Sequence, residues 1–178
     1  MQLYTERLFL RDMNRHDKQA IFDYHSDAEA NKFQSWIPEN PEEVEQFIER
    51  NIKEFNQPES WYQVLITEKE SGAVLGDIGI HFFGKEHLQV ELGITLNKSF
   101  HGKGYAAEAL AGLIDFLFND LKKHRIMASV DPDNLASIRL MERIGLRKEG
   151  HFVKSLFWKN QWVDDVIYAV LREEWTEK

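Results

Sequence analysis

Three consecutive segments in the first half of the chain have the composition of β-strands, and short polar turns separate them. Residues 61–69 (WYQVLITEK) and 73–83 (AVLGDIGIHFF) are rich in β-branched and aromatic side chains. In residues 88–96 (LQVELGITL), apolar side chains alternate with polar residues or glycine, as in a strand with one buried face. Because such short turns join strands that lie side by side, the sequence predicts an antiparallel meander of three strands.

One short strand and two helices are predicted before the meander. Alternating apolar residues indicate a strand over residues 7–13, and Asp17 stands where it could cap a helix over residues 18–27. Residues 39–55 indicate a second helix, with Pro41 in its first position and acidic residues in its first turn. The apolar residues that recur there at helical spacing are Val44, Phe47, Ile48 and Ile52.

Helices and strands alternate after the meander. A long helix is predicted from Gly104 onward, and its apolar stripe is Ala106, Leu110, Leu113, Ile114, Leu117 and Leu121. A later helix over residues 135–144 is expected to end at Gly145. The remaining strand candidates are residues 125–130, 147–158 and 163–171.

These segments together predict an α/β (α+β) fold: a mixed, mostly antiparallel central sheet of about seven strands, flanked by about four helices. No repeat, low-complexity tract or linker interrupts the 178 residues. We therefore expect residues 1–178 to form a single domain.

Composition excludes several classes of protein. The chain has 22 Lys and Arg against 30 Asp and Glu, and the formal charge of −8 disfavours binding to nucleic acid, which depends on clustered basic side chains. No apolar run approaches the ~18 residues that span a bilayer, and the charged N-terminal segment is unlike a signal peptide. We expect a cytoplasmic protein without a membrane partner or a metal. Because the chain has no cysteine, disulfides, thiolate metal sites and cysteine nucleophiles are impossible.

The junction between the meander and the long helix carries two glycines in the sequence HGKGYA, residues 101–106. Gly102, Gly104 and Ala107 match the dinucleotide fingerprint G-x-G-x-x-A, but that motif belongs in a parallel βαβ unit, and the strand before it ends a meander. The phosphate loop of ATPases needs Lys-Ser or Lys-Thr after its last glycine, and Tyr105 stands there instead. A plain strand-to-helix turn, in which glycine permits positive φ, is the structural alternative.

Basic residues beside the glycines favour an anion site over a plain turn. Lys98, His101 and Lys103 surround the start of a helix whose first backbone N–H groups lack helical acceptors and whose dipole attracts negative charge. The two glycines have no Cβ and let a phosphate approach the backbone closely. A pyrophosphate there is expected to accept hydrogen bonds from the amides of Lys103, Gly104, Tyr105 and Ala106.

HGKGYA is similar to the Gln/Arg-x-x-Gly-x-Gly/Ala loop of the GNAT superfamily of acetyl-CoA-dependent N-acetyltransferases, although His101 stands where the family usually has Gln or Arg. ELGITL, just before the loop, resembles the family's splayed fourth strand. NLASIRLMERIGLRKEG resembles the segment from its fifth strand to its fourth helix. The Asn-x-x-Ser sequence, GLRKEG and the tail WVDDVIYAVLREEW resemble the branch that contains the ribosomal-protein N-terminal (alanine) acetyltransferases.

The resemblance implies an enzyme that moves the acetyl group of acetyl-CoA, its co-substrate, to a primary amine. That amine is either a protein N-terminal α-amine or the amine of a small molecule. The splayed strand of the family pairs its backbone with the pantetheine arm and stabilises the oxyanion with a strand N–H, which maps here to Leu92, Ile94 and Leu96. Asn134 is placed to bind the pantetheine and also to cap the following helix. The pyrophosphate site maps to the loop residues His101, Gly102, Lys103, Gly104, Tyr105 and Ala106.

The acceptor amine must lose a proton before it attacks, and three residues are candidates for the base. Glu91 is preferred, because it faces away from the apolar side of its strand and lies just upstream of the expected oxyanion site. His81 and Asp77, on the neighbouring strand, are the alternatives.

The leaving thiolate can take a proton from an acid or leave unaided. Met141 occupies the place of the tyrosine that many family members use, so that acid is missing here. The resemblance to the ribosomal-protein branch transfers the acid role to Ser137, with Tyr168 as a substitute.

Without a cysteine, the common thiol acyl-enzyme is impossible, so direct transfer in a ternary complex is expected. Only the resemblance to the family implies a homodimer. A non-catalytic acyl-CoA-binding or regulatory domain of the same fold is the alternative function, because a fold does not determine an activity. Candidates for the walls of the acceptor pocket are Trp36, Trp61, Phe157, Trp158 and Trp162.

Overall fold

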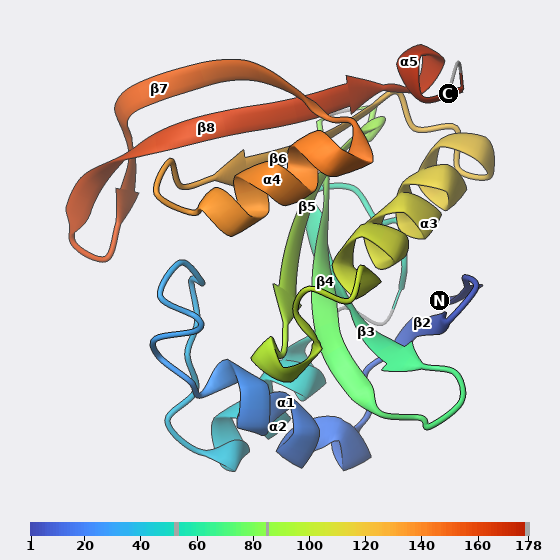
Figure 1. Cartoon of the computed structure of the whole chain (residues 1–178), viewed down its shortest axis with the longest axis vertical. Helices are drawn as coiled ribbons and strands as arrows, with labels where there is room; N and C mark the ends of the chain where they lie inside the picture. The colour runs from blue at the N-terminus through green and yellow to red at the C-terminus, as the bar shows by residue number, and fades with distance from the viewer. Residues whose placement is uncertain (52–53, 85, 177–178) are drawn as a thin grey trace.

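The computed structural model describes residues 1–51, 54–84 and 86–176, and a sheet of eight strands runs through it in the order β1-β2-β3-β4-β5-β6-β8-β7 (Figure 1). β3 (Ser60–Glu68), β4 (Val74–Phe83) and β5 (Gln89–Leu96) form the predicted antiparallel meander. Among the described strands, only β5 and β6 (Arg125–Val130) pair in parallel. The predicted mixed, mostly antiparallel sheet is therefore confirmed.

The two edges of the sheet come from the two ends of the chain. β1 (Gln2–Tyr4) pairs with β2 (Leu8–Asp12) at one edge, and β7 (Arg147–Trp158) pairs with β8 (Gln161–Leu171) at the other. The sheet has one strand more than the seven predicted, because β1 is only three residues long and shows no alternating pattern in the sequence.

Helices cover both faces of the sheet. α3 (Tyr105–Asn119) and α4 (Leu135–Ile144) lie on the face turned toward the viewer in Figure 1. α1 (Lys18–His25) and α2 (Pro41–Arg50) pack against each other at the bottom of the same view. α5 (Arg172–Thr176), which follows β8, was not predicted and brings the number of α-helices among the described residues to five.

The sheet has a hydrophobic core on each face, and alternate side chains of β3 point into one core or the other. Val64 and Ile66 are fully buried in the large core, to which α3 and α4 contribute. Leu65, between them, points to the other face and packs with Ile21 of α1 and Val44 of α2. Successive side chains of a strand point to opposite faces of the sheet, so a strand buried on both faces needs apolar residues at consecutive positions.

The predicted helix ends agree with the structure in most places. Asn40 caps α2 by accepting a hydrogen bond from the Glu43 N–H at 3.0 Å, and Pro41 follows in the first position. Gly145 ends α4 with φ of 92°, as predicted. α2 ends at Arg50, and Ile52 lies outside the described residues. The residues that α3 buries are Ala109, Leu110, Leu113, Ile114, Leu117 and Phe118, whereas Ala106 and Leu121 are half-buried.

Asp17 precedes α1 as predicted, but its side chain does not cap that helix. It receives a hydrogen bond from the Asn14 N–H at 2.8 Å and forms an ion pair of 2.6 Å with Arg11. The carboxylate therefore closes a short 3₁₀ turn, Arg15–Asp17, in front of the helix.

Candidate active site

The site begins where β5 and β6 part. The two strands pair at only three positions, from Gln89 with Arg125 to Glu91 with Met127, and β5 then continues to Leu96 without β6 beside it. After Glu91, β5 has no strand paired on the side of β6, and side chains hydrogen-bond to its backbone there instead. Gln34 Nε2 donates to the Ile94 carbonyl at 3.3 Å, and a ring nitrogen of His101 donates to the Leu96 carbonyl at 2.8 Å.

These two contacts show which way the backbone of β5 faces. In an extended strand, the N–H and C=O of one residue point to the same side. Because the carbonyls of Ile94 and Leu96 face the gap between the strands, their N–H groups face it as well. An extended ligand could therefore pair with β5 in the gap, as an added strand would.

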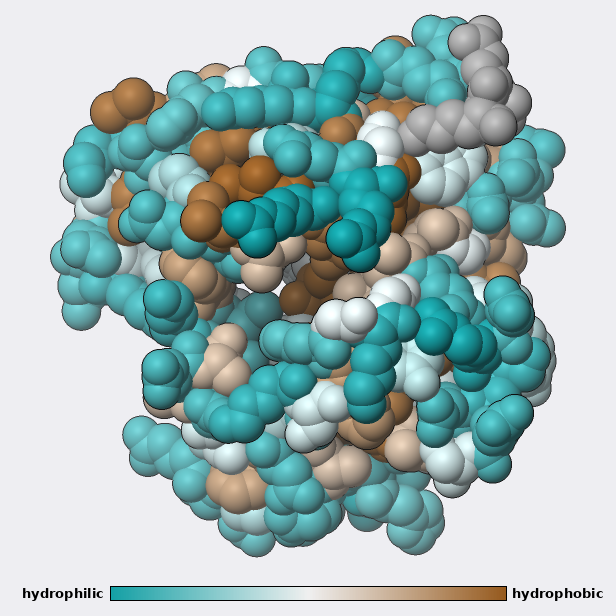
Figure 2. Space-filling view, in the orientation of Figure 1, coloured by the Kyte–Doolittle hydropathy of each residue, from teal (hydrophilic) through white to brown (hydrophobic). Residues whose placement is uncertain are grey.

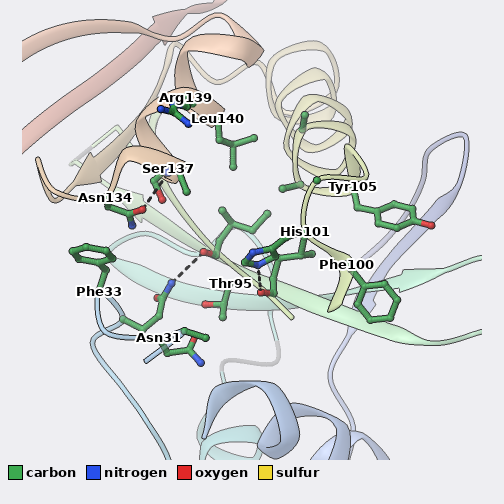
Figure 3. A pocket seen from close by; sticks show the side chains of 18 of the residues that line it. Asn31, Phe33, Thr95, Phe100, His101, Tyr105, Asn134, Ser137, Arg139 and Leu140 are labelled. Atoms are coloured by element: carbon green, nitrogen blue, oxygen red, sulfur yellow. Dashed lines mark hydrogen bonds between the residues drawn. The ribbon is translucent and has the colours of Figure 1, made fainter. Parts of the chain in front are cut away.

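A cavity of about 400 Å³, here called the first cavity, lies in this gap. Figure 2 shows that this face of the molecule is hollowed, with hydrophobic residues inside the hollow and hydrophilic residues around it. The glycine loop, the start of α4 and the segment 30–34 close around the cavity (Figure 3). Of the residues predicted to hold the coenzyme, the following line it: Ile94, Leu96, His101, Gly102, Gly104, Tyr105, Ala106 and Asn134.

Two predicted coenzyme residues do not line the first cavity. The side chain of Leu92 is 6% exposed and belongs to the large core. Lys103 places its ammonium 5.3 Å from the ring centroid of Phe100. Only the backbone of Lys103 remains a candidate for a contact with an anion at the loop.

The glycine loop has the backbone shape that an anion site needs. Gly102 and Gly104 have φ of 73° and 82°, in the left-handed region that other residues adopt only with strain. The first helical hydrogen bond of α3 runs from the Glu108 N–H to the Gly104 carbonyl, so the amides before Glu108 have no acceptor within the helix. A Cβ added to Gly102 would have no atom within 4 Å, and the space beside it is therefore open to a ligand.

Residues before β2 support the loop from behind. Arg7 Nη1 donates to the Lys103 carbonyl at 3.1 Å, and Arg7 Nε donates to Glu108 Oε2 at 2.6 Å. Glu108 also accepts hydrogen bonds from the Thr5 hydroxyl at 2.6 Å and from the Arg7 N–H at 2.7 Å. Burial opposes the charged form of Glu108, but these hydrogen bonds from Thr5 and Arg7 outweigh it and lower its pKa.

Of the three basic residues expected beside the glycine loop, only His101 lines the first cavity. Lys98 forms an ion pair with Asp27, whose hydrogen bond raises the pKa of Lys98. Three other basic residues line the cavity: Lys32, Arg139 and Arg143. The spacing of four between the two arginines places both on one face of α4 and was the sequence signal that could have revealed them.

Asn134 and Ser137 stand together at the start of α4. Asn134 Oδ1 accepts a hydrogen bond from the Ser137 N–H at 3.2 Å, so Asn134 caps the helix, and both residues line the first cavity (Figure 3). Met141 is buried in the large core, one turn further along the helix. Tyr168 does not reach the cavity, because its hydroxyl donates to Glu142 Oε1 at 3.1 Å. Burial and this hydrogen bond raise the pKa of Tyr168.

A second cavity of about 370 Å³ adjoins the first, and Phe33, Gln34 and Thr95 line both. The two cavities therefore meet at Thr95. Glu91 and Asp77, two of the three candidate bases, line the second cavity, whereas His81 does not. Of the predicted aromatic walls, Trp36, Trp61 and Trp158 line it, whereas Phe157 and Trp162 pack against each other with tilted rings and are more than half exposed.

Glu91 and His81 lie opposite each other on β5 and β4. Glu91 Oε2 is 3.5 Å from His81 Nδ1, and about a quarter of each side chain is exposed. The His81 ring stacks on Trp61 with 4.6 Å between the ring centroids. The histidine ring is thus fixed by packing, and Glu91 keeps access to the cavity.

Asp77 is buried opposite Thr95 and is engaged by two residues that the sequence analysis missed. Asp77 Oδ2 accepts a hydrogen bond from the Tyr24 hydroxyl at 2.6 Å and lies 2.7 Å from His25 Nε2. Burial, together with the charge of Asp77, raises the pKa of Tyr24 well above its usual value. Tyr24 and His25 are neighbours at the end of α1, and no motif in the sequence pairs them with β4.

The described residues form neither a metal cluster nor a helix that could span a membrane. Within residues 1–51, 54–84 and 86–176, no group of three or more His, Cys, Asp or Glu residues could hold a metal ion. No helix in these ranges is long and apolar enough to cross a membrane.

Known proteins resemble this chain over nearly its whole length. Residues 7–147 match the family model described as "Acetyltransferase (GNAT) domain". The "Uncharacterized N-acetyltransferase YnaD" of Bacillus subtilis is 33% identical over 178 residues, which cover 98% of this chain and 99% of that protein. The "[Ribosomal protein uS5]-alanine N-acetyltransferase" of Escherichia coli is 28% identical over 183 residues, which cover 99% of this chain and 93% of that protein.

The fold agrees with a solved structure of the same family. A crystal structure of an acetyltransferase (GNAT family) from Bacillus anthracis has a TM-score of 0.88 and 32% sequence identity. The match covers 98% of this chain and 100% of that one. The parted strands and the glycine loop agree with this similarity, and the chain belongs to the GNAT superfamily of acetyl-CoA-dependent N-acetyltransferases.

Proposed function

We propose that this chain, as a single domain over residues 1–178, transfers the acetyl group of acetyl-CoA directly to a primary amine in a ternary complex. The parting of β5 and β6 carries the proposal. It opens the first cavity beside a backbone that can bind an extended ligand, and that cavity meets the second one at Thr95. An acyl donor in the first cavity and an amine in the second would react where the cavities join.

The residues around the first cavity suit the parts of acetyl-CoA. The amides of the glycine loop, with Arg139 and Arg143 nearby, suit the phosphates. The backbone of Ile94 and Leu96 suits the amides of the pantetheine arm, and Asn134 supplies a further polar contact. This arrangement directs the thioester toward Thr95.

The chemistry at the junction involves two proton transfers, one from the amine and one to the sulfur. The amine nitrogen attacks the thioester carbon, the C–N bond forms, and the C–S bond breaks with release of the coenzyme A thiolate. An N–H of β5 that faces the gap, such as that of Ile94, stabilises the negative charge on the carbonyl oxygen. Glu91 takes the proton from the amine, directly or through water, and Ser137 gives a proton to the thiolate sulfur and takes one back from water.

The acceptor is a protein N-terminal α-amine or a small-molecule amine. Similarity to the uS5-alanine N-acetyltransferase supports the first choice. The second cavity has a volume of about 370 Å³, within the range of about 300–1,000 Å³ that is typical of small-molecule sites.

The absence of cysteine allows a sensitive test. A thiol-reactive dye reports only coenzyme A that is released, since the chain itself has no thiol. We expect release above the rate of hydrolysis with at least one member of a panel of N-terminal peptides, diamines, polyamines and aminoglycosides. Tight binding of acetyl-CoA without release on any amine would instead support a non-catalytic acyl-CoA-binding domain.

A further inference from the structure

The two cavities carry charges of opposite sign. Among the described residues, the first cavity is lined by basic side chains and by no Asp or Glu. The second cavity, in the part of the chain that the structure describes, is lined by five carboxylates and by no Lys or Arg. The five acidic residues are Asp77, Glu91, Asp131, Asp164 and Asp165. Because the cavities adjoin, this separation favours an anionic ligand in one and a cationic ligand in the other.

The five carboxylates lie on both sides of the gap between the parted strands. Glu91 is on β5, and Asp77 is on β4 beside it. Asp131 follows the end of β6, and Asp164 and Asp165 are on β8. A cation with a single charge would approach only one of these two groups, whereas an amine with a charge at each end could reach both.

Asp131, Asp164 and Asp165, on the β6 and β8 side of the gap, are here called the far group. Two of them, Asp131 and Asp165, face the same space. Val130 and Val166 form the last pair between β6 and β8, so Asp131 and Asp165 occupy the next positions across the two strands. Like charges in such positions destabilise each other unless a cation lies between them. Among the described residues, these carboxylates accept hydrogen bonds from neutral donors: Ser129 Oγ donates to Asp165 Oδ1 at 2.7 Å, and the Asp133 N–H donates to Asp131 Oδ1 at 2.8 Å.

Asp77 and Glu91, on the β4 and β5 side of the gap, are here called the near group and lie at the junction of the two cavities. Two hydrogen-bond acceptors near them have no partner among the described residues. His25 is 5% exposed and lines the second cavity, and its Nδ1 has no partner among the described residues. Gln63 also lines the cavity, and its Oε1 is buried without a partner among them. When His25 Nε2–H donates to Asp77, Nδ1 is an acceptor, as Oε1 is. A ligand that donates several N–H bonds at this end, as an ammonium or amine does, matches both atoms.

Aromatic rings complete the surroundings of a cation. Trp36 and Trp61 line the second cavity, as does Trp158, whose ring already has the Lys159 ammonium 4.3 Å from its centroid. The faces of tryptophan rings attract cations, and their hydrocarbon surface suits the methylene chain between two charged groups. The volume of about 370 Å³ favours a small molecule over a folded protein segment.

We propose that the second cavity selects a small amine with at least two positive charges, such as a diamine or polyamine. Asp131 and Asp165 hold the far ammonium, and the near nitrogen lies beside Asp77 and Thr95 and is the one that is acetylated. This proposal rests on the proposed function, since it assigns the acceptor of that reaction.

The first experiment compares two acceptors of equal chain length in the thiol-dye assay, 1,4-diaminobutane and 1-aminobutane. A lost hydrogen bond or ion pair to a charged group costs about a factor of ten or more, so we expect kcat/KM for the diamine to exceed that for the monoamine at least about tenfold. Equal values for the two amines, or turnover of peptides without any turnover of diamines, would overturn the proposal while leaving the acetyltransferase activity intact.

The second experiment identifies the residues responsible. Asp131→Asn and Asp165→Asn are each expected to lower the diamine-to-monoamine ratio of kcat/KM about tenfold. Asp133→Asn, an exposed residue in the same turn that does not line the cavity, is the matched control and should leave the ratio unchanged. An unchanged ratio in both cavity variants would overturn the assignment of Asp131 and Asp165.

Direct binding separates this proposal from the proposed function. Spermidine is titrated calorimetrically into the chain saturated with coenzyme A, at low and high salt. Salt-sensitive binding that Asp165→Asn weakens would support the cation site even if no amine were acetylated. Absence of binding together with absence of turnover would overturn it.

Discussion

Arg7 and Glu108 clamp the start of α3 from positions 101 residues apart in the sequence: Arg7 Nε donates to Glu108 Oε2 at 2.6 Å. The same arginine donates to the Lys103 carbonyl inside the glycine loop. The loop therefore keeps its shape through a contact with the segment between β1 and β2, and not through its glycines alone.

The clamp predicts that Glu108→Gln weakens both the fold and the coenzyme site. The variant loses charge-assisted hydrogen bonds from Arg7, so we expect a lower free energy of unfolding and several-fold weaker binding of coenzyme A. Calorimetry and denaturant unfolding measure the two effects. Glu6→Gln, an exposed neighbour of Arg7, is the control, and equal effects of both variants would contradict the clamp.

The same residue predicts a dependence of stability on pH. The folded-state pKa of Glu108 is lowered, so its contribution is present above the pKa of an unfolded glutamate, about 4.3, and is lost as the pH falls through the folded value. The difference in unfolding free energy between the chain and Glu108→Gln should therefore be full at pH 7 and shrink below about pH 4. A difference that does not change with pH would show that the charge of Glu108 is not what stabilises the loop.

A matched pair of glycines tests the anion cradle. Gly102 and Gly72 have nearly the same φ, 73° and 71°, and a Cβ at either would have no atom within 4 Å. Alanine at either position should therefore cost a similar strain, about 1–2 kcal/mol of stability. Only Gly102→Ala should also weaken coenzyme A, by about tenfold or more, because its methyl group would stand where a phosphate approaches the loop. Equal coenzyme affinities of the two variants would place the phosphates elsewhere.

The arginines of α4 give a prediction about ionic strength. Arg139→Gln and Arg143→Gln should each raise the Kd for coenzyme A about tenfold at low salt and should reduce its dependence on salt concentration. Arg50→Gln, an exposed residue at the end of α2, is the control. Unchanged affinity in both cavity variants would mean that α4 supplies no phosphate contact.

The candidate base can be tested by its pH profile. Glu91→Gln should lower kcat/KM at neutral pH by about 10²-fold or more and make the remaining activity rise more steeply toward high pH, where free amine is abundant. Initial rates between pH 6 and 10, with Glu42→Gln on the exposed side of α2 as control, measure this. A parallel profile in the variant would reject Glu91 and direct attention to Asp77 or His81.

The sequence predicted those parts of the fold and site that depend on local patterns. The meander follows from strands joined by short turns, and Pro41 and Gly145 mark helix ends through their own backbone restrictions. The glycine loop could be located because two glycines precede a long apolar stripe within a few residues.

The sequence did not predict contacts between distant segments. The partners of Asp77, Tyr24 and His25, lie 53 and 52 positions away, and their pairing depends on how α1 packs on β4. Lys98 was expected at the anion site for the same reason, because its partner Asp27 is remote in the sequence. The short strand β1 was missed because three residues carry too little periodicity to be distinguished from a loop.

Direct transfer in a ternary complex is tested most directly by initial rates measured with acetyl-CoA and the amine varied together. The adjoining cavities predict double-reciprocal lines that intersect, and intact-mass spectra of the chain with acetyl-CoA alone that show no added acetyl group. Parallel lines together with an acetylated chain, which transfers its acetyl group when amine is added, would contradict the account.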